Sequence, residues 1–193
     1  MALLTTGLAL FFIVHLVPAL PSVRAGLIER LGAGPYRGLF SLASIAGLVA
    51  FVLGYGQMQG LARSNPELWT PPVWIKHVVL LLMIPAMVLL VAAYVPSRIR
   101  SAVRHPMLTA LMIWAFAHLL ANGDLASLLL FGSFLAFAVI DRISVMARPS
   151  PGPLGDARGG ALHDMAVIVA GLALYLLILF WGHARLTGVP LLP

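Results

Sequence analysis

The sequence predicts an all-α fold, a polytopic bundle of about six membrane-spanning helices that occupies a single domain, residues 1–193. Three observations lead to this fold class. Hydrophobic residues make up 61% of the 193-residue chain, whereas soluble domains contain about 45–50%. Charged residues make up 9%, too few to cover the surface of a water-soluble protein. The apolar residues also gather in segments that approach the roughly 20 residues needed to cross a bilayer.

Six apolar segments follow one another along the chain. They are Leu3–Val17, Gly38–Tyr55, Trp74–Tyr94, Met107–Ala121, Leu125–Ile140 and Met165–Trp181. The fourth and fifth segments are short for a membrane span, and they are separated by Asn122, Gly123 and Asp124 alone. Because Asn-Gly-Asp is typical of turns, these two segments are predicted to form a tight helical hairpin.

Basic residues in the connections predict the orientation, because cytoplasmic loops of membrane proteins are enriched in Lys and Arg. The first, third and fifth connections hold nine arginines: Arg24, Arg30, Arg37, Arg98, Arg100, Arg104, Arg142, Arg148 and Arg158. The opposite side holds Arg63, Lys76 and Arg185. We therefore expect both termini to lie outside the cytoplasm.

Several classes of function are excluded or disfavoured by composition. The chain has no cysteine, so disulfides, thiolate metal sites and cysteine nucleophiles are excluded. Motifs of metalloproteases, P-loop nucleotidases and serine hydrolases are missing. The net charge of +6 would suggest nucleic-acid binding in a soluble protein. Here the basic residues flank apolar segments, so membrane topology explains them and no nucleic acid is expected as a partner.

Histidines are the strongest candidates for chemistry in so apolar a chain, since ionisable groups within a membrane are costly and face the bundle interior or water. His15, His77 and His118 lie within predicted spans. His105, His163 and His183 lie at span ends, where we interpret them as interfacial residues.

His118 lies twelve residues beyond Pro106 and so roughly 18 Å into the membrane from the cytoplasmic side, at 1.5 Å per residue. Trp114 and Asn122 share its helix face. Asn122 is expected to bind one ring nitrogen and fix the tautomer, which leaves the other nitrogen as a metal ligand. The alternative is a neutral histidine that hydrogen-bonds between helices.

A second histidine at the depth of His118 would complete a haem or metal site, as in other helix bundles. His15 lies about 18 Å below the outer surface, within several ångströms of His118 in a core of about 30 Å. His77 matches that level about as well, although neighbouring Trp74 and Lys76 also suit an interfacial anchor. The residues alone leave the choice between His15 and His77 open.

Several motifs resemble the NnrU family, and the similarity extends from about residue 3 to residue 183. The amino-terminal motifs are Val14-His15, Leu20–Arg24 and Gly34–Ser41, followed by Pro71–Trp74, Lys76-His77 and Ala92–Pro96. The most specific are Arg104–Met107, Ile113–His118 and Asn122–Asp124. This family includes proteins associated with nitrite and nitric oxide reduction in denitrifying bacteria. It is also related to the plant 15-cis-ζ-carotene isomerase, a haem b membrane enzyme.

The resemblance implies a haem b whose iron is bound by His118, in a Trp-x-x-Ala-His motif, and by His15. It also implies a multi-pass protein of the bacterial inner membrane, so that the termini expected outside the cytoplasm would be periplasmic. Two functions follow: an isomerase that acts on an apolar polyene, or a non-catalytic haem sensor or accessory protein for nitrite and nitric oxide respiration. Ala115 stands where the plant pattern has a cysteine, which weakens the isomerase hypothesis without excluding haem.

Arg104-His105-Pro106 also resembles an element of membrane methyltransferases of the isoprenylcysteine type. Those enzymes carry glutamates downstream of this element, whereas this chain has none after Glu67. A His before Pro is also ordinary geometry at a helix start. A methyltransferase is therefore the least favoured interpretation.

Overall fold

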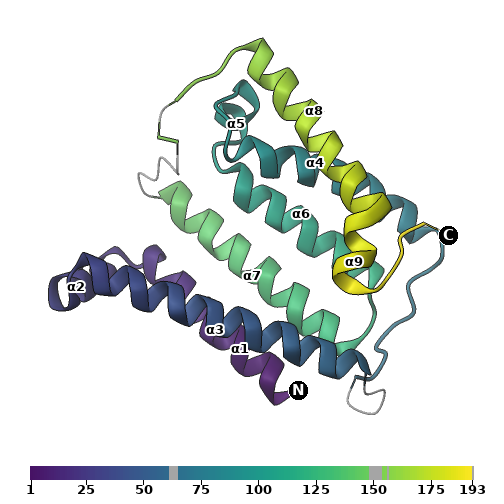
Figure 1. Cartoon of the computed structure of the whole chain (residues 1–193), viewed down its shortest axis with the longest axis horizontal. Coiled ribbons are helices and arrows are strands. Elements are labelled where there is room, and N and C mark those ends of the chain that lie inside the picture. Colours follow the sequence, from purple (N-terminus) through teal and green to yellow (C-terminus); the bar gives the residue numbers. More distant parts are fainter. Residues whose placement is uncertain (61–64, 148–153, 156, 193) are drawn as a thin grey trace.

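A computed structural model describes residues 1–60, 65–147, 154–155 and 157–192 of the chain. Within these residues every regular element is helical, so the predicted all-α class is confirmed (Figure 1). In chain order the elements are α1 (Ala2–Leu16), η1 (Val17–Ala19), α2 (Pro21–Leu31), α3 (Ala33–Gly60), α4 (Ile75–Ala92), α5 (Arg98–Val103), α6 (Pro106–Ala121), α7 (Leu125–Ala147), α8 (Ala161–Leu177), η3 (Ile178–Gly182) and α9 (His183–Thr187).

Each of the six predicted segments overlaps one apolar helix of the structure. Five of these helices are long and apolar enough to cross a membrane, and α6 is a shorter apolar helix of 16 residues. The predicted limits of α3 and α7 were too narrow, because both helices continue beyond their apolar part into polar sequence. Hydropathy marks the apolar length, whereas backbone hydrogen bonding sets where a helix ends. Helices α2 and α5 lie in connections for which no helix was predicted.

The amino-terminal helices α1 and α3 pack with their backbones in close approach. A Cβ atom added at Gly47 would lie 2.8 Å from the Phe11 nitrogen, and one at Gly54 would overlap the backbone of Leu4. Small residues at such positions are typical of helix pairs in membranes. A buried apolar cluster that includes Leu4, Leu8, Phe51 and Phe131 then joins this pair to α7.

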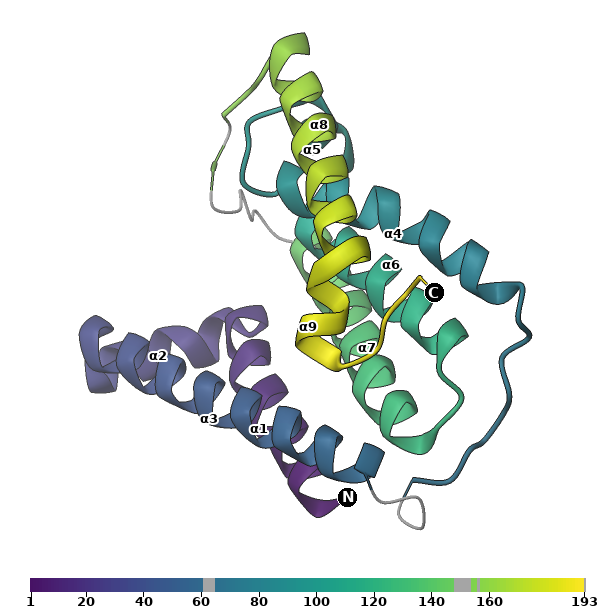
Figure 2. The same cartoon turned by 45° about the vertical axis from the view of Figure 1, so that its right-hand side comes forward.

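The carboxy-terminal helices α4, α6, α7 and α8 form the second part of the bundle (Figures 1 and 2). Helix α4 packs against both α6 and α8, and the contact with α8 is close at Gly171, where an added Cβ atom would lie 2.6 Å from Val88 Cα. Pro85 lies inside α4, and the helix runs on without interruption.

The arginine-bearing connections lie toward one end of the bundle. Figure 1 shows α2, α5 and the start of α8 at this end, with the amino terminus, the turn between α6 and α7, and α9 toward the other. Arg63 and Arg148 lie outside the described residues. We call the arginine-rich end the inner end and the opposite one the outer end. The assignment of the inner end to the cytoplasm stays a prediction.

Candidate functional site

His118 lies three residues before the end of α6, with its ring among aromatic side chains. Its Nδ1–H donates a hydrogen bond to the Trp114 carbonyl oxygen at 2.8 Å. The ring centroid lies 5.0 Å from that of Trp114 and 4.6 Å from that of Phe131. With Nδ1 engaged, Nε2 is the nitrogen that can bind a metal.

The expectation that Asn122 fixes the His118 tautomer is wrong. Asn122 follows the last residue of α6, and its side-chain amide donates to the main-chain carbonyl of His118 at 2.8 Å. The side chain therefore caps the helix end, where carbonyl groups lack partners within the helix. Trp114 performs the orienting role through its backbone.

His15 has the same local arrangement at the inner end of α1. Its Nδ1–H donates to the Phe11 carbonyl oxygen at 2.7 Å. The ring stacks on that of Phe11 with a centroid distance of 4.0 Å, and it lies 5.2 Å from Phe40 and 6.2 Å from Phe137. Its Nε2 is therefore likewise the nitrogen that can bind a metal.

The two histidines border one aromatic cluster at different levels. His118 packs on Phe131 of α7 and His15 on Phe137, which are six residues and so about 9 Å apart along the helix. The rings of Phe11, Phe134 and Trp114 lie between them, with centroid distances of 5.9 Å and 5.6 Å along this path. Among the ring contacts of the described residues, none joins His15 and His118 directly.

His77 lies in the first turn of α4, and its side chain is exposed. Its Nδ1–H donates to the Trp74 carbonyl oxygen at 3.2 Å. Among the contacts of the described residues, none joins His77 to His118 or His15. This position agrees with the interfacial alternative.

His183 lies at the outer end of the last span, as the sequence predicted, but its electrostatic interaction with His118 was not predicted. It begins α9, directly after the π-helical turn η3. Its Nδ1–H donates to the Val189 carbonyl oxygen at 2.7 Å, and it lies close enough to His118 for an electrostatic interaction. Since His183 and His118 lie on helices that are distant in the sequence, hydropathy could not have indicated this interaction.

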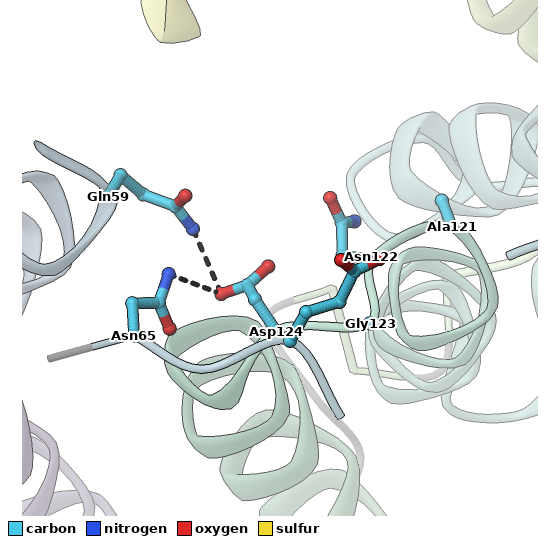
Figure 3. Close-up of a pocket in the computed structure, with 7 residues that line it drawn as sticks. Gln59, Asn65, Ala121, Asn122, Gly123 and Asp124 are labelled. Carbon is cyan, nitrogen blue, oxygen red and sulfur yellow. Dashed lines mark hydrogen bonds between the residues drawn. The ribbon is translucent and has the colours of Figure 1, made fainter. Parts of the chain in front are cut away.

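A polar cluster, which we call the outer clasp, fastens the turn between α6 and α7 to the end of α3. Figure 3 shows Gln59 and Asn65 pointing toward Asp124, whose carboxylate accepts hydrogen bonds from both at 3.1 and 2.9 Å. The same carboxylate accepts from the Ser127 backbone at 2.9 Å and from its hydroxyl at 2.7 Å. Tyr55 completes the outer clasp through the Ser127 hydroxyl at 3.0 Å.

Electrostatics agree with a structural role for the outer clasp. Burial opposes ionisation of Asp124, but hydrogen bonds from Ser127 and Asn65 outweigh it and hold the pKa of this carboxyl below its ordinary value. The clasp borders an open hollow of about 360 Å³, with Asn122 on its far side (Figure 3). Since four protein donors already satisfy the carboxylate, it is poorly suited to bind a cation.

An apolar groove of about 460 Å³ runs along the other side of α6. Ile75 of α4, Phe116 and Leu120 of α6 and Leu135 of α7 line it, and Trp69 lies at its outer end. Its lining is almost free of polar surface, so it suits an extended hydrocarbon.

A metal ion held by protein alone needs several ligands in one place. Within the described ranges, no group of three or more His, Cys, Asp or Glu side chains is placed to hold a metal ion. Haem needs fewer protein ligands, because its macrocycle supplies four nitrogens and the protein adds one or two. His118 meets this lower requirement.

Comparison with known proteins identifies the family. A family model described as "NnrU protein" matches residues 3–191 of the 193-residue chain, so the chain belongs to the NnrU family. The resemblance noted from the motifs is thereby confirmed. Searches of curated proteins and of solved structures returned no match.

Proposed function

We propose that this member of the NnrU family binds one haem b within the membrane through His118. The observation that carries the proposal is the orientation of the imidazole. Its Nδ1–H is held by the Trp114 carbonyl, as is usual for histidines that bind a metal through the other nitrogen. Trp114 and Phe131 supply the apolar surroundings, and the haem, when bound, would supply the redox and ligand-binding chemistry.

His15 is the second axial ligand that the family resemblance implies. His15 and His118 pack against Phe137 and Phe131, which are six residues and so about 9 Å apart along α7. Holding one haem with both histidines would require the rings of Phe11 and Phe134 between them to move. We therefore propose that His118 would hold the haem, and that His15 would join it only after such a movement.

The first functional hypothesis is an enzyme that isomerises double bonds of a long apolar polyene. The groove beside α6 supports it, because its apolar lining suits such a molecule and its position lets a substrate enter sideways from the lipid. The second is a haem sensor or accessory protein for nitrite and nitric oxide respiration, without turnover. Ligation by His118 alone would support this alternative, because a haem held in that way could bind nitric oxide.

The proposed location is the bacterial inner membrane, with both termini in the periplasm. Reporter fusions after the last helix and within residues 24–37 test the orientation. Periplasmic activity of the first and cytoplasmic activity of the second are expected. The reverse pattern would contradict the predicted orientation.

The ligand test uses optical spectra of the purified full-length protein after reconstitution with haem. A Soret band is expected in the natural sequence, and His118→Ala should abolish it or strongly reduce haem content. His163→Ala is the matched control, because this exposed histidine lies at the opposite end of the bundle. Absence of a Soret band in the natural protein, or an unchanged spectrum in His118→Ala, would refute haem binding through His118.

Three further alanine variants identify the second axial position. If one of His15, His77 and His183 is the second ligand of the iron, its substitution should convert a six-coordinate low-spin spectrum to a high-spin one. Substitution of the other two should leave the spectrum unchanged. If all three variants keep the natural spectrum, the second face is open or holds a ligand from outside the chain. Nitric oxide should then shift the Soret band, whereas conversion of a cis-polyene, followed by chromatography, would identify an isomerase.

A further inference from the structure

A basic cluster at the inner end of the bundle is separate from the histidine sites. It forms where α5 ends, α6 begins and α7 leaves the apolar region, and we call it the inner arginine cluster. Its members are Arg100, Arg104, His105 and Arg142. The Ser97 hydroxyl accepts from the backbone nitrogen of Arg100 at 3.1 Å and so caps α5. Arg100 is buried, and its guanidinium donates to the carbonyls of Gly155 and Ala157.

Arg142 is the member whose hydrogen bonding is incomplete. Its Nη2 donates to the Val103 carbonyl oxygen at 3.1 Å. Its Nη1 is buried, and it is the one buried side-chain nitrogen or oxygen of the described residues that has no hydrogen-bond partner. Leaving a buried N–H of a charged group without an acceptor is costly. Arg142 Nη1 is therefore a charged hydrogen-bond donor for which the described residues supply no acceptor.

The surroundings of Arg142 are strongly cationic. His105 lies within electrostatic reach of Arg142, Arg104 and Arg100, and Asp141 is the one carboxylate among these neighbours. Burial lowers the pKa of His105, and the positive charge of Arg142 lowers it further, whereas Asp141 opposes the shift. An anion beside Arg142 would offset this concentration of positive charge.

We propose that the inner arginine cluster is a binding site for a phosphate group, which accepts a hydrogen bond from Arg142 Nη1 and lies beside His105 and Arg104. A guanidinium matches phosphate oxygens through two parallel N–H donors. The chain crosses the bilayer next to this site, so a phospholipid headgroup and free inorganic phosphate are the two sources of the same chemistry. The site is independent of haem, because its residues make none of the contacts described for His118 or His15.

The test measures thermal stabilisation of the delipidated full-length protein in neutral detergent. Inorganic phosphate is compared with chloride and acetate at equal ionic strength. Phosphate should stabilise the natural protein most, and Arg142→Met should weaken phosphate binding about tenfold or more, as for loss of a charged hydrogen bond. Arg24→Met is the matched control, because Arg24 lies at the same end and packs over Tyr36; its binding should equal that of the natural protein.

Lipid as the source is tested in nanodiscs of phosphatidylcholine with and without phosphatidylglycerol. Phosphatidylglycerol that is retained through purification by the natural protein but not by Arg142→Met identifies a headgroup site. Stabilisation by inorganic phosphate alone identifies a free anion. Both results support the phosphate site, whereas no preference for either probe, or equal effects of Arg142→Met and Arg24→Met, overturns it.

A second measurement keeps the test decisive if Arg142→Met fails to fold. Arg142→Lys retains the charge but lacks the planar pair of donors, so it should fold and still bind phosphate more weakly. In the natural protein, the pKa of His105, followed by NMR, should rise when phosphate is added and stay unchanged with chloride. If the pKa of His105 stays unchanged when phosphate is added, the proposed location of the phosphate site is refuted.

Discussion

The two polar clusters at opposite ends of the bundle differ in how completely the protein satisfies them. In the outer clasp, Asp124 accepts four hydrogen bonds from protein donors. In the inner arginine cluster, Arg142 keeps a buried Nη1 without an acceptor. A cluster whose polar groups all have hydrogen-bond partners stabilises the fold. A cluster that contains a buried donor without an acceptor is suited to bind a ligand that supplies one.

The largest effect is expected from Gly123→Ala, which breaks the outer clasp by steric conflict. A Cβ atom at this buried glycine would overlap the Trp69 carbonyl, and the Gly123 carbonyl itself accepts from the backbone nitrogens of Leu68 and Trp69. Overpacking of this kind costs about 1–3 kcal/mol or more. Thermal unfolding in detergent measures the loss. Gly132→Ala is the control, because its nearest neighbour would lie 4.0 Å away, and an equal loss in both variants would contradict the explanation.

The second-largest effect is expected from acid, which should lower the stability that the outer clasp contributes. The folded-state pKa of Asp124 lies below its ordinary value of 3.8, so the stability that this carboxylate contributes is fully present above the unfolded-state pKa. It is lost as the pH falls through the lower, folded-state pKa. Melting temperatures from pH 7 to pH 3 should therefore fall in the acid range, and Asp124→Asn should flatten that fall. Parallel curves for both proteins would show that other groups control acid stability.

Arg142→Met is expected to change stability much less than loss of an outer-clasp acceptor. Without a bound anion, Arg142 has a buried Nη1 without an acceptor and one hydrogen bond, from Nη2 to the Val103 carbonyl. Removal of the unpaired buried donor offsets the loss of that one bond, so exchange for an apolar side chain of similar length should cost little. Arg100→Met should be destabilising, because the Gly155 and Ala157 carbonyls lose their donor. Melting of both variants in phosphate-free detergent checks this order, and a large loss in Arg142→Met would show that Arg142 is a structural fastener.

Much of this architecture was predictable because apolar length and turn chemistry are local properties of the sequence. The six segments and the Asn122–Asp124 turn follow from such signals. The structure adds the reason for the glycine at the centre of the turn: the Trp69 carbonyl occupies the place of a Cβ atom. The positions of the histidines depend on packing between distant helices. Depth alone placed His15 and His118 at similar levels, but their contacts on α7 are offset. The electrostatic interaction of His183 with His118 likewise joins two helices that are distant in the sequence, and hydropathy does not reveal which helices are neighbours.

Within the outer clasp, the smallest effect is expected from Tyr55→Phe, which removes one peripheral hydrogen bond. The Ser127 hydroxyl donates its proton to Asp124 at 2.7 Å, so the Tyr55 hydroxyl must be the donor in its 3.0 Å contact with Ser127. Its removal leaves Ser127 and Asp124 joined, and the cost should be about 0.5–1.5 kcal/mol, the net value of one hydrogen bond.

Tyr94→Phe, at an exposed tyrosine, is the control with no expected change. Because Tyr55 acts through Ser127, its effect should shrink in the Ser127→Ala background, as a double-mutant cycle measures. Strict additivity of the two substitutions would show that Tyr55 is not part of the outer clasp.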